Sequence, residues 1–188
     1  MAATLTLNDS TVDHNVAPGG GGIASGNGMG GGAGSAITLN KSVISNNTAI
    51  DGFESGGGGV SNGGTLVSNN SQIIDNHAVG DSEVGAGLLN HATATLNKTT
   101  VSGNTATEGA FGGGIVNAIF FLGQPTPTML INNGQVTGNS ADGGGGGIVN
   151  ISFDPAAQAG TVTLHHTDVS GNTPDNCEPP GAVPGCIG

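Results

Sequence analysis

Apolar and polar positions recur along this chain with a period of about 30 residues. A Val or Ile with an Asn three positions later occurs six times. Before each of these segments lies a short stretch in which apolar and polar residues alternate, clearest at residues 4–7 and 161–164. After it, a Gly-rich stretch ends in a Gly followed directly by Ile23, Val60, Leu88, Ile115 or Ile148. The six Asn residues are Asn15, Asn47, Asn76, Asn104, Asn139 and Asn172.

Each repeat therefore contains three short β segments separated by turns, and no segment can bury its apolar side alone. Stacking the repeats solves this problem, because equivalent apolar residues then form columns inside a solenoid. The pattern predicts an all-β fold, a right-handed parallel β-helix of about six coils and three parallel sheets. We expect one domain over residues 1–188, ending in a cap loop at 175–188. The expected coils cover residues 4–35, 36–64, 65–92, 93–127, 128–160 and 161–174.

The repeated Asn residues have an interpretation that needs no ligand. Stacked amides one turn apart can donate to and accept from one another as a structural ladder. A second Asn column lies one residue past the alternating segment, and we interpret it in the same way. Its members are Asn8, Asn40, Asn69, Asn97 and Asn132, with His165 at the end.

Composition narrows the possible partners. The chain has 188 residues with 38 Gly, and its net charge is −11 because 13 acidic residues face two Lys and no Arg. Because the chain has so few cationic side chains, we expect it to bind neither nucleic acid nor an anionic membrane surface. No apolar stretch is long enough for a transmembrane helix, so we expect no membrane insertion. The first residues lack the basic and apolar regions of a signal peptide.

The repeat resembles a known family. Val101 to Asn104 with Gly113-Gly114-Ile115, and Val136 to Asn139 with Gly146-Gly147-Ile148, are similar to the GG[A/L/I/V] and FxxN repeats of polymorphic outer-membrane-protein passengers. They also resemble secreted bacterial β-helix proteins of the pectin-lyase-like superfamily. The resemblance covers residues 4–172, with Val or Ile where the passenger repeats usually have Phe. It implies fold more than function, since this architecture carries lyases, hydrolases, adhesins and tail spikes.

Both cysteines, Cys177 and Cys186, follow the last repeat in a segment rich in Pro and Gly. Their spacing without clustered His favours a structural disulfide over a metal or redox pair. A disulfide would close a cap loop over the last coil. It also predicts an oxidising setting, and so an extracellular or cell-surface location.

Catalysis is not favoured by the residues available. Lyases of the resembled fold need Arg or Lys beside carboxylates, whereas Lys41 and Lys98 lie in one column about 10 Å apart among amides. Hydrolases need two or three carboxylates on neighbouring turns. Asp13, Asp75 and Asp168 do not provide them. We therefore expect a non-catalytic, adhesin-like scaffold that contacts a glycan, a protein or itself. A polysaccharide-active enzyme or carbohydrate-binding module is the alternative.

A further alternative is ice binding. The outward positions of the alternating segment carry Thr-x-Thr in three of the six repeats, an arrangement used by ice-binding solenoids. Thr is also a favourable strand residue in general. The paired positions are Thr4/Thr6, Ala36/Thr38, Thr65/Val67, Thr93/Thr95, Thr128/Leu130 and Thr161/Thr163.

Two weaker expectations concern an edge and an end of the solenoid. Acidic residues in the turns before the Gly-rich segments would stack along one edge and could bind Ca²⁺. We favour a solubilising stripe there, because the spacing matches no calcium motif, and we expect no cofactor. The first strand begins at Thr4, so its uncovered edge favours end-to-end self-association. The acidic residues are Asp51, Glu54, Asp81, Glu83, Glu108 and Asp142.

Overall fold

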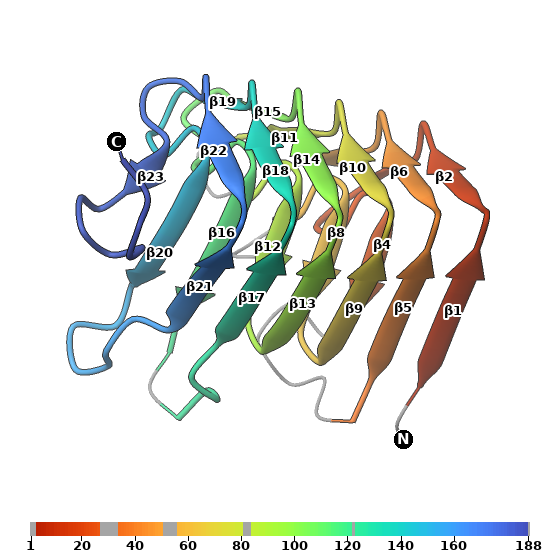
Figure 1. Cartoon of the computed structure of the whole chain (residues 1–188), viewed down its shortest axis with the longest axis horizontal. Helices are drawn as coiled ribbons and strands as arrows, with labels where there is room; N and C mark the ends of the chain where they lie inside the picture. The colour runs from red at the N-terminus through yellow and green to blue at the C-terminus, as the bar shows by residue number, and fades with distance from the viewer. Residues whose placement is uncertain (1–2, 27–33, 51–55, 81–83, 122, 188) are drawn as a thin grey trace.

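The computed structural model describes residues 3–26, 34–50, 56–80, 84–121 and 123–187. They form an all-β solenoid of about five turns in which equivalent strands of successive turns pair in parallel (Figure 1). The two termini lie at opposite ends of the stack (Figure 1). The parallel solenoid predicted from the repeat is confirmed, although each turn passes through four sheets rather than three.

The first and second sheets contain the alternating segment and the segment that leads to the repeated Asn. The first sheet consists of β1 (Thr4–Asn8), β5 (Ala36–Asn40), β9 (Thr65–Asn69), β13 (Thr93–Asn97), β17 (Thr128–Asn132) and β21 (Thr161–His165). The second consists of β2 (Thr11–Asp13), β6 (Val43–Ser45), β10 (Gln72–Ile74), β14 (Thr100–Ser102), β18 (Gln135–Thr137) and β22 (Asp168–Ser170).

The third sheet follows the repeated Asn, and the fourth contains the segment after the paired glycines. The third consists of β3 (Val16–Ala17), β7 (Thr48–Ile50), β11 (His77–Val79), β15 (Thr105–Thr107) and β19 (Ser140–Ala141). The fourth consists of β4 (Ile23–Ser25), β8 (Val60–Asn62), β12 (Leu88–Asn90), β16 (Ile115–Ile119), β20 (Ile148–Ser152) and β23 (Cys177–Glu178).

The expectation of three sheets was wrong because the strands of the third sheet carry little apolar signal. They are two or three residues long, and in four of the five the buried position is a small Ala rather than a Leu, Val or Ile. The expected count of six coils was also too high. The last one supplies β21 and β22, after which the chain turns into the short cap strand β23.

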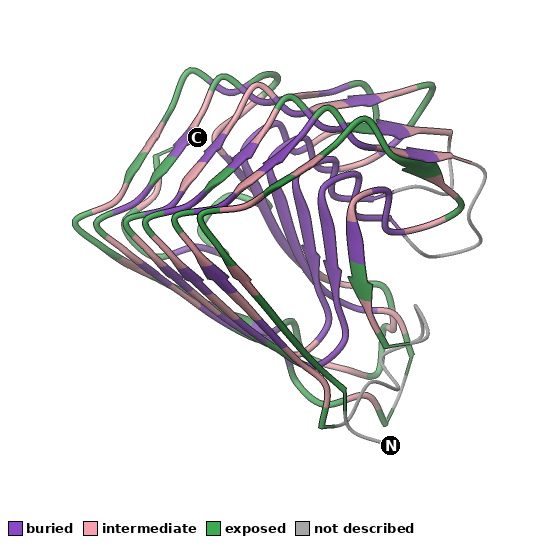
Figure 2. Ribbon diagram, turned by 90° about the vertical axis from the view of Figure 1, so that its right-hand side faces the viewer, coloured by how far each residue is buried: buried purple, intermediate pink, exposed green. Residues whose placement is uncertain are grey.

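The main core lies inside the turns, where columns of aliphatic side chains from three of the sheets meet. Its fully buried members include Leu39, Ile44, Leu88 and Ile115. A second apolar layer lies on the other face of the fourth sheet, built from Val84, Leu89, Val116, Ala118 and Val149. Figure 2 shows buried residues along the inner strands and exposed residues at the corner between the first and second sheets.

Candidate functional site

The repeated Asn residues form a hydrogen-bonded ladder, buried inside the solenoid except for Asn15 on the exposed first turn. Each Nδ2 donates to the Oδ1 of the equivalent Asn one turn later, over 2.9 to 3.0 Å, and Asn172 continues the ladder to Asn176 at 3.1 Å. Asn76 illustrates the pattern, since its Nδ2 also donates to the Ile44 carbonyl and its Oδ1 also accepts from the Asn47 backbone. These bonds occupy both donors and both lone pairs of this amide. We call this set the buried ladder.

A Gly precedes every fourth-sheet strand except β23, and it packs against the buried ladder. A Cβ on Gly87 would lie 2.5 Å from the Gly114 carbonyl and 2.9 Å from the Nδ2 of Asn104. A Cβ on Gly59 or Gly114 would meet the equivalent atoms of the following turn at similar distances. The Gly-Gly-Ile and Val-x-x-Asn segments are therefore two sides of one contact, which explains why they repeat together.

The second Asn column forms a ladder on the surface. Here the Nδ2 of each Asn donates to the Oδ1 of the preceding turn, from Asn40 to Asn8 and onward to Asn132, over 2.8 to 2.9 Å. This direction is opposite to that of the buried ladder. The amides are half-buried or exposed, so one face of this ladder remains open to solvent.

A third ladder runs along the end of the fourth sheet. Asn62, Asn90 and Asn117 each donate from Nδ2 to the Oδ1 of the next turn, over 2.7 to 2.9 Å. Asn150 ends the series by donating to the Ala182 carbonyl at 3.1 Å. The third ladder therefore connects the body of the solenoid to its C-terminal loop.

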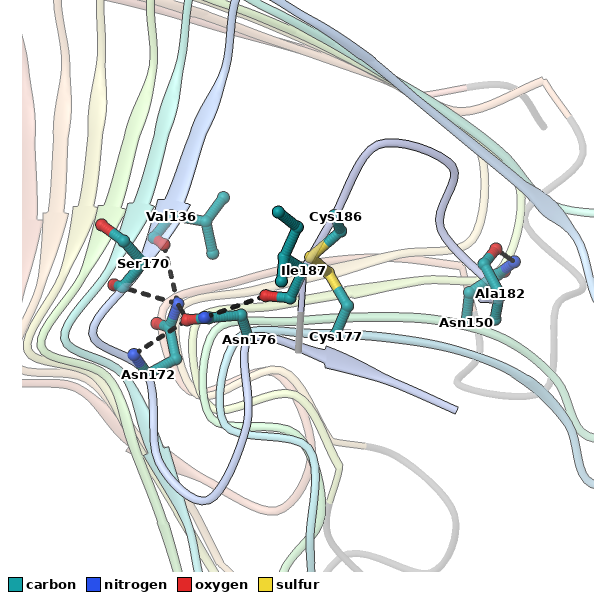
Figure 3. Close-up of a disulfide and its surroundings, with 9 residues drawn as sticks. All are labelled: Val136, Asn150, Ser170, Asn172, Asn176, Cys177, Ala182, Cys186 and Ile187. Carbon is teal, nitrogen blue, oxygen red and sulfur yellow. Dashed lines mark hydrogen bonds between the residues drawn. A yellow bond between two sulfur atoms is a disulfide. The ribbon is translucent and has the colours of Figure 1, made fainter. Parts of the chain in front are cut away.

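The C-terminal loop covers the last turn (Figure 3). Cys177 pairs with Ile148 in the fourth sheet and forms the predicted disulfide with Cys186. Cys177 and Val183 are buried in the main core, so the loop closes the apolar columns at this end. Asn176, which ends the buried ladder, donates to the Ile187 carbonyl at 3.1 Å.

Two carboxylates lie in this cap with incomplete hydrogen bonding. Asp175 Oδ1 and Glu178 Oε2 are buried atoms without a hydrogen-bond partner among the described residues. Burial raises the pKa of Glu178, and the negative charge of Asp175 raises it further. With only two such groups, the cap does not provide the six to eight oxygen ligands that Ca²⁺ takes.

The acidic edge, which we weighed as a weak calcium candidate, falls mostly on residues outside the described structure, namely Asp51, Glu54, Asp81 and Glu83. Of the remaining pair, Asp142 Oδ2 accepts a hydrogen bond from the Glu108 backbone N–H at 3.2 Å. Within the described ranges, no three His, Cys, Asp or Glu side chains are grouped in a way that could hold a metal ion.

Sequence reasoning missed a cluster of rings outside the fourth sheet. His91 is almost completely buried, its ring centroid is 5.0 Å from that of Phe120, and Phe120 stacks on Phe153 at 4.7 Å. Neither ring nitrogen of His91 has a hydrogen-bond partner among the described residues. Burial lowers the pKa of His91 to about 4, and the Ala118 backbone offsets only part of the shift. The available signal was positional, since both Phe residues lie three positions after a third-ladder Asn.

The outward face of the first sheet is neutral throughout. The register places Thr4, Ala36, Thr65, Thr93, Thr128 and Thr161 in one column and Thr6, Thr38, Val67, Thr95, Leu130 and Thr163 in the next. None of the six strands contains Asp or Glu. In a chain with 13 acidic residues, this neutral face is an unusual surface.

Comparison with known proteins identifies no family for this chain: no protein-family model, curated protein or solved structure matches it. Among the described residues, no helix has the length and apolar character to cross a membrane.

Proposed function

We propose that this chain is a non-catalytic, secreted or cell-surface scaffold of the adhesin type. It presents its stacked sheet faces to a glycan, a protein or another copy of itself. One observation carries the proposal: the amides of the buried ladder form hydrogen bonds with one another and with the backbone. Polar groups committed in this way maintain the rod and are not free to bind a substrate.

The handedness of the solenoid and the location of the protein are part of the same proposal. We infer a right-handed coil, since parallel crossovers in one sheet are overwhelmingly right-handed. The likeness of the repeat to passenger and pectin-lyase-like proteins supports a surface role. The Cys177–Cys186 disulfide supports an extracellular location, because disulfides persist in oxidising compartments.

A panel of neutral and acidic polysaccharides tests the scaffold against the enzyme alternative. Bound protein and new reducing or unsaturated chain ends are measured on the same samples. We expect retention on a subset of surfaces with no new chain ends. If the number of new chain ends rises with protein concentration, the scaffold proposal is wrong and the protein is a polysaccharide-active enzyme.

Ice binding is a second candidate, favoured by the neutral first-sheet face and its aligned Thr columns. Three turns carry both Thr side chains, and Ala36, Val67 and Leu130 interrupt the pattern with apolar groups. Thermal hysteresis and ice-crystal shape at millimolar protein test this candidate. Normal crystal growth at that concentration would remove it.

A further inference from the structure

The two cations of this acidic chain lie on one corner of the solenoid. Lys41 and Lys98 are both exposed, each directly after the surface ladder and at the border of the acid-free first sheet. The surface-ladder register pairs Asn40 with Asn69 and Asn69 with Asn97, so the lysines lie two turns apart on either side of Asn70. This separation is about 10 Å along the stack. We call the set Asn40, Lys41, Asn69, Asn70, Asn97 and Lys98 the lysine corner.

The backbone at this corner does not favour lysine. All six residues that follow the first-sheet strands have positive φ, including Lys41 at 48° and Lys98 at 49°. Asn, Asp and His are the side chains that tolerate this left-handed conformation best. The other four turns follow this preference with Asp9, Asn70, Asn133 and His166. Both lysines therefore stand where Asn would be less strained, and such strain is often found at functional positions.

The surface ladder supplies further binding groups between the lysines. Asn69 donates one Nδ2 hydrogen to Asn40 and accepts one hydrogen bond from Asn97. An amide has two donors and two lone pairs, so one donor and one lone pair of Asn69 remain uncommitted within the described residues. The corner thus offers an amide on every turn and an ammonium on every second turn.

We propose that the lysine corner binds an extended acidic polysaccharide that carries a carboxylate on every second sugar and lies along the stack. In an extended polysaccharide, the length of one pyranose unit is close to the distance between successive turns of this solenoid. Alternate carboxylates then reach Lys41 and Lys98, and the sugar hydroxyls meet the amides of Asn40, Asn69 and Asn97. The three adjoining first-sheet strands carry no acidic residue, and the nearest carboxylate of the column, Asp9, lies one turn beyond Lys41 on the side away from Lys98. The inference rests on the proposed scaffold function and names its glycan.

The chain itself supplies the test substitutions. Lys41→Asn and Lys98→Asn install the residue found at Asn70 and Asn133, so the variants fold without new strain. Hyaluronan oligosaccharides, in which glucuronate alternates with a neutral amino sugar, are titrated at low salt by NMR. Neutral chitin oligosaccharides and dextran sulfate serve as comparison ligands. Because exposed ion pairs are weak, we expect each single substitution to weaken hyaluronan binding about three- to fivefold and the double variant about ten- to twentyfold.

Two controls separate a site from general charge attraction. Asp75→Asn removes one negative charge at an exposed turn on a different corner. General charge attraction would strengthen hyaluronan binding by this variant, whereas we expect unchanged binding. The Tm of each lysine variant should stay the same or rise, since Asn fits the left-handed backbone better. A lower Tm would contradict the strain argument.

The inference is overturned if hyaluronan does not bind at low salt or if the double variant binds as tightly as the original chain. Equal binding of chitin oligosaccharides or dextran sulfate would also overturn it, because the alternating carboxylates would then not be recognised. Any of these results leaves the scaffold proposal intact. Cleavage of bound hyaluronan would instead overturn the scaffold proposal and support the site.

Discussion

The asparagines of this solenoid place one side chain in two contrasting environments. In the buried ladder, Asn104 is fully buried and bonds to amides above and below it, and to the Ile73 and Ser102 carbonyls. In the surface ladder, Asn97 makes the same kind of amide chain with only its two neighbours while half-buried. The energetic importance of the amide should therefore differ between the two, because water can replace a bond only at the surface.

Replacing Asn104 by Ala should lower the free energy of unfolding by about 2–3 kcal/mol or more. The substitution leaves Asn76 and Asn139 without their partner in a dry environment. Asn97→Ala is the matched control and should cost less than about 1 kcal/mol. Urea unfolding of both variants measures the difference, and equal losses would show that burial does not set the strength of the ladders.

His91 should make the stability of the protein depend on pH. Its pKa is lowered from 6.5 to about 4 in the folded state, whereas the unfolded chain retains the ordinary value. Between these values the unfolded state binds more protons, so the free energy of unfolding falls as the pH decreases from 6.5 to about 4. The loss is about 3 kcal/mol, since one pKa unit corresponds to about 1.4 kcal/mol.

His91→Leu should remove this part of the acid sensitivity, as seen in urea unfolding at pH 7 and pH 4.5. His77→Gln is the control, because His77 is exposed on β11 and its replacement should leave the pH profile unchanged. If the free energy of unfolding of His91→Leu depends on pH as steeply as that of the original chain, the acid sensitivity comes from the carboxylates instead.

At the scale of the strands, sequence periodicity predicts those elements that place a large apolar residue at a fixed offset. Residues such as Leu39, Ile44 and Leu88 mark the first, second and fourth sheets in this way. The third sheet was missed because its buried residues are Ala49, Ala78, Ala106 and Ala141, which are common in turns and helices as well. The useful signal was their position, since each lies two residues after a buried-ladder Asn.

Side-chain contacts outside the coil were harder to predict than the strands. The alternation rule assigns the second residue of each fourth-sheet strand to solvent, yet Leu89, Val116 and Val149 are buried in a second apolar layer. The cysteine pair was predictable because its partners are close in sequence. His91 and Phe120 come from different turns and meet only after the coil has formed, so no local pattern brings them together.

The disulfide of the cap should act locally. Replacing both Cys177 and Cys186 by Ser should lower the free energy of unfolding by about 2–3 kcal/mol, the cost of closing so short a loop. Hydrogen exchange should speed up at the Ile148 amide, which donates to Asn176 in the cap. The Leu88 amide, which donates to Gly114 in mid-stack, is the internal control and should not change. Uniform acceleration would indicate that the disulfide supports the whole solenoid.

At the scale of the whole molecule, the two ends of the stack differ. The C-terminal loop buries Val183 in the core, whereas the first turn leaves Leu5 and Val16 at 39% and 63% exposure. A hollow of about 170 Å³ at this end is lined by Leu5, Ala24 and Ile37, among others. Exposed strand edges beside apolar side chains are sites where a second chain can pair.

We therefore expect concentration-dependent association through the first turn, measured by sedimentation. Leu5→Asp should weaken it strongly, because a charge would enter the apolar contact. Ile187→Asp at the opposite end is the control, since Ile187 is 84% exposed and should not contribute. A chain that remains monomeric at millimolar concentration, or responds equally to both substitutions, would contradict this expectation.

The arrangement of strands also determines how the molecule responds to tension. The termini lie at opposite ends of the stack, so a pull on them is directed along the backbone hydrogen bonds that join successive turns (Figure 1). The load enters through the chain ends, so we expect the end turns to peel away first. Equivalent ladder residues are 27 to 35 positions apart. Each turn that peels away therefore lengthens the tether by about 100 Å. We therefore expect the solenoid to extend in steps under tension, with work dissipated as each turn peels away.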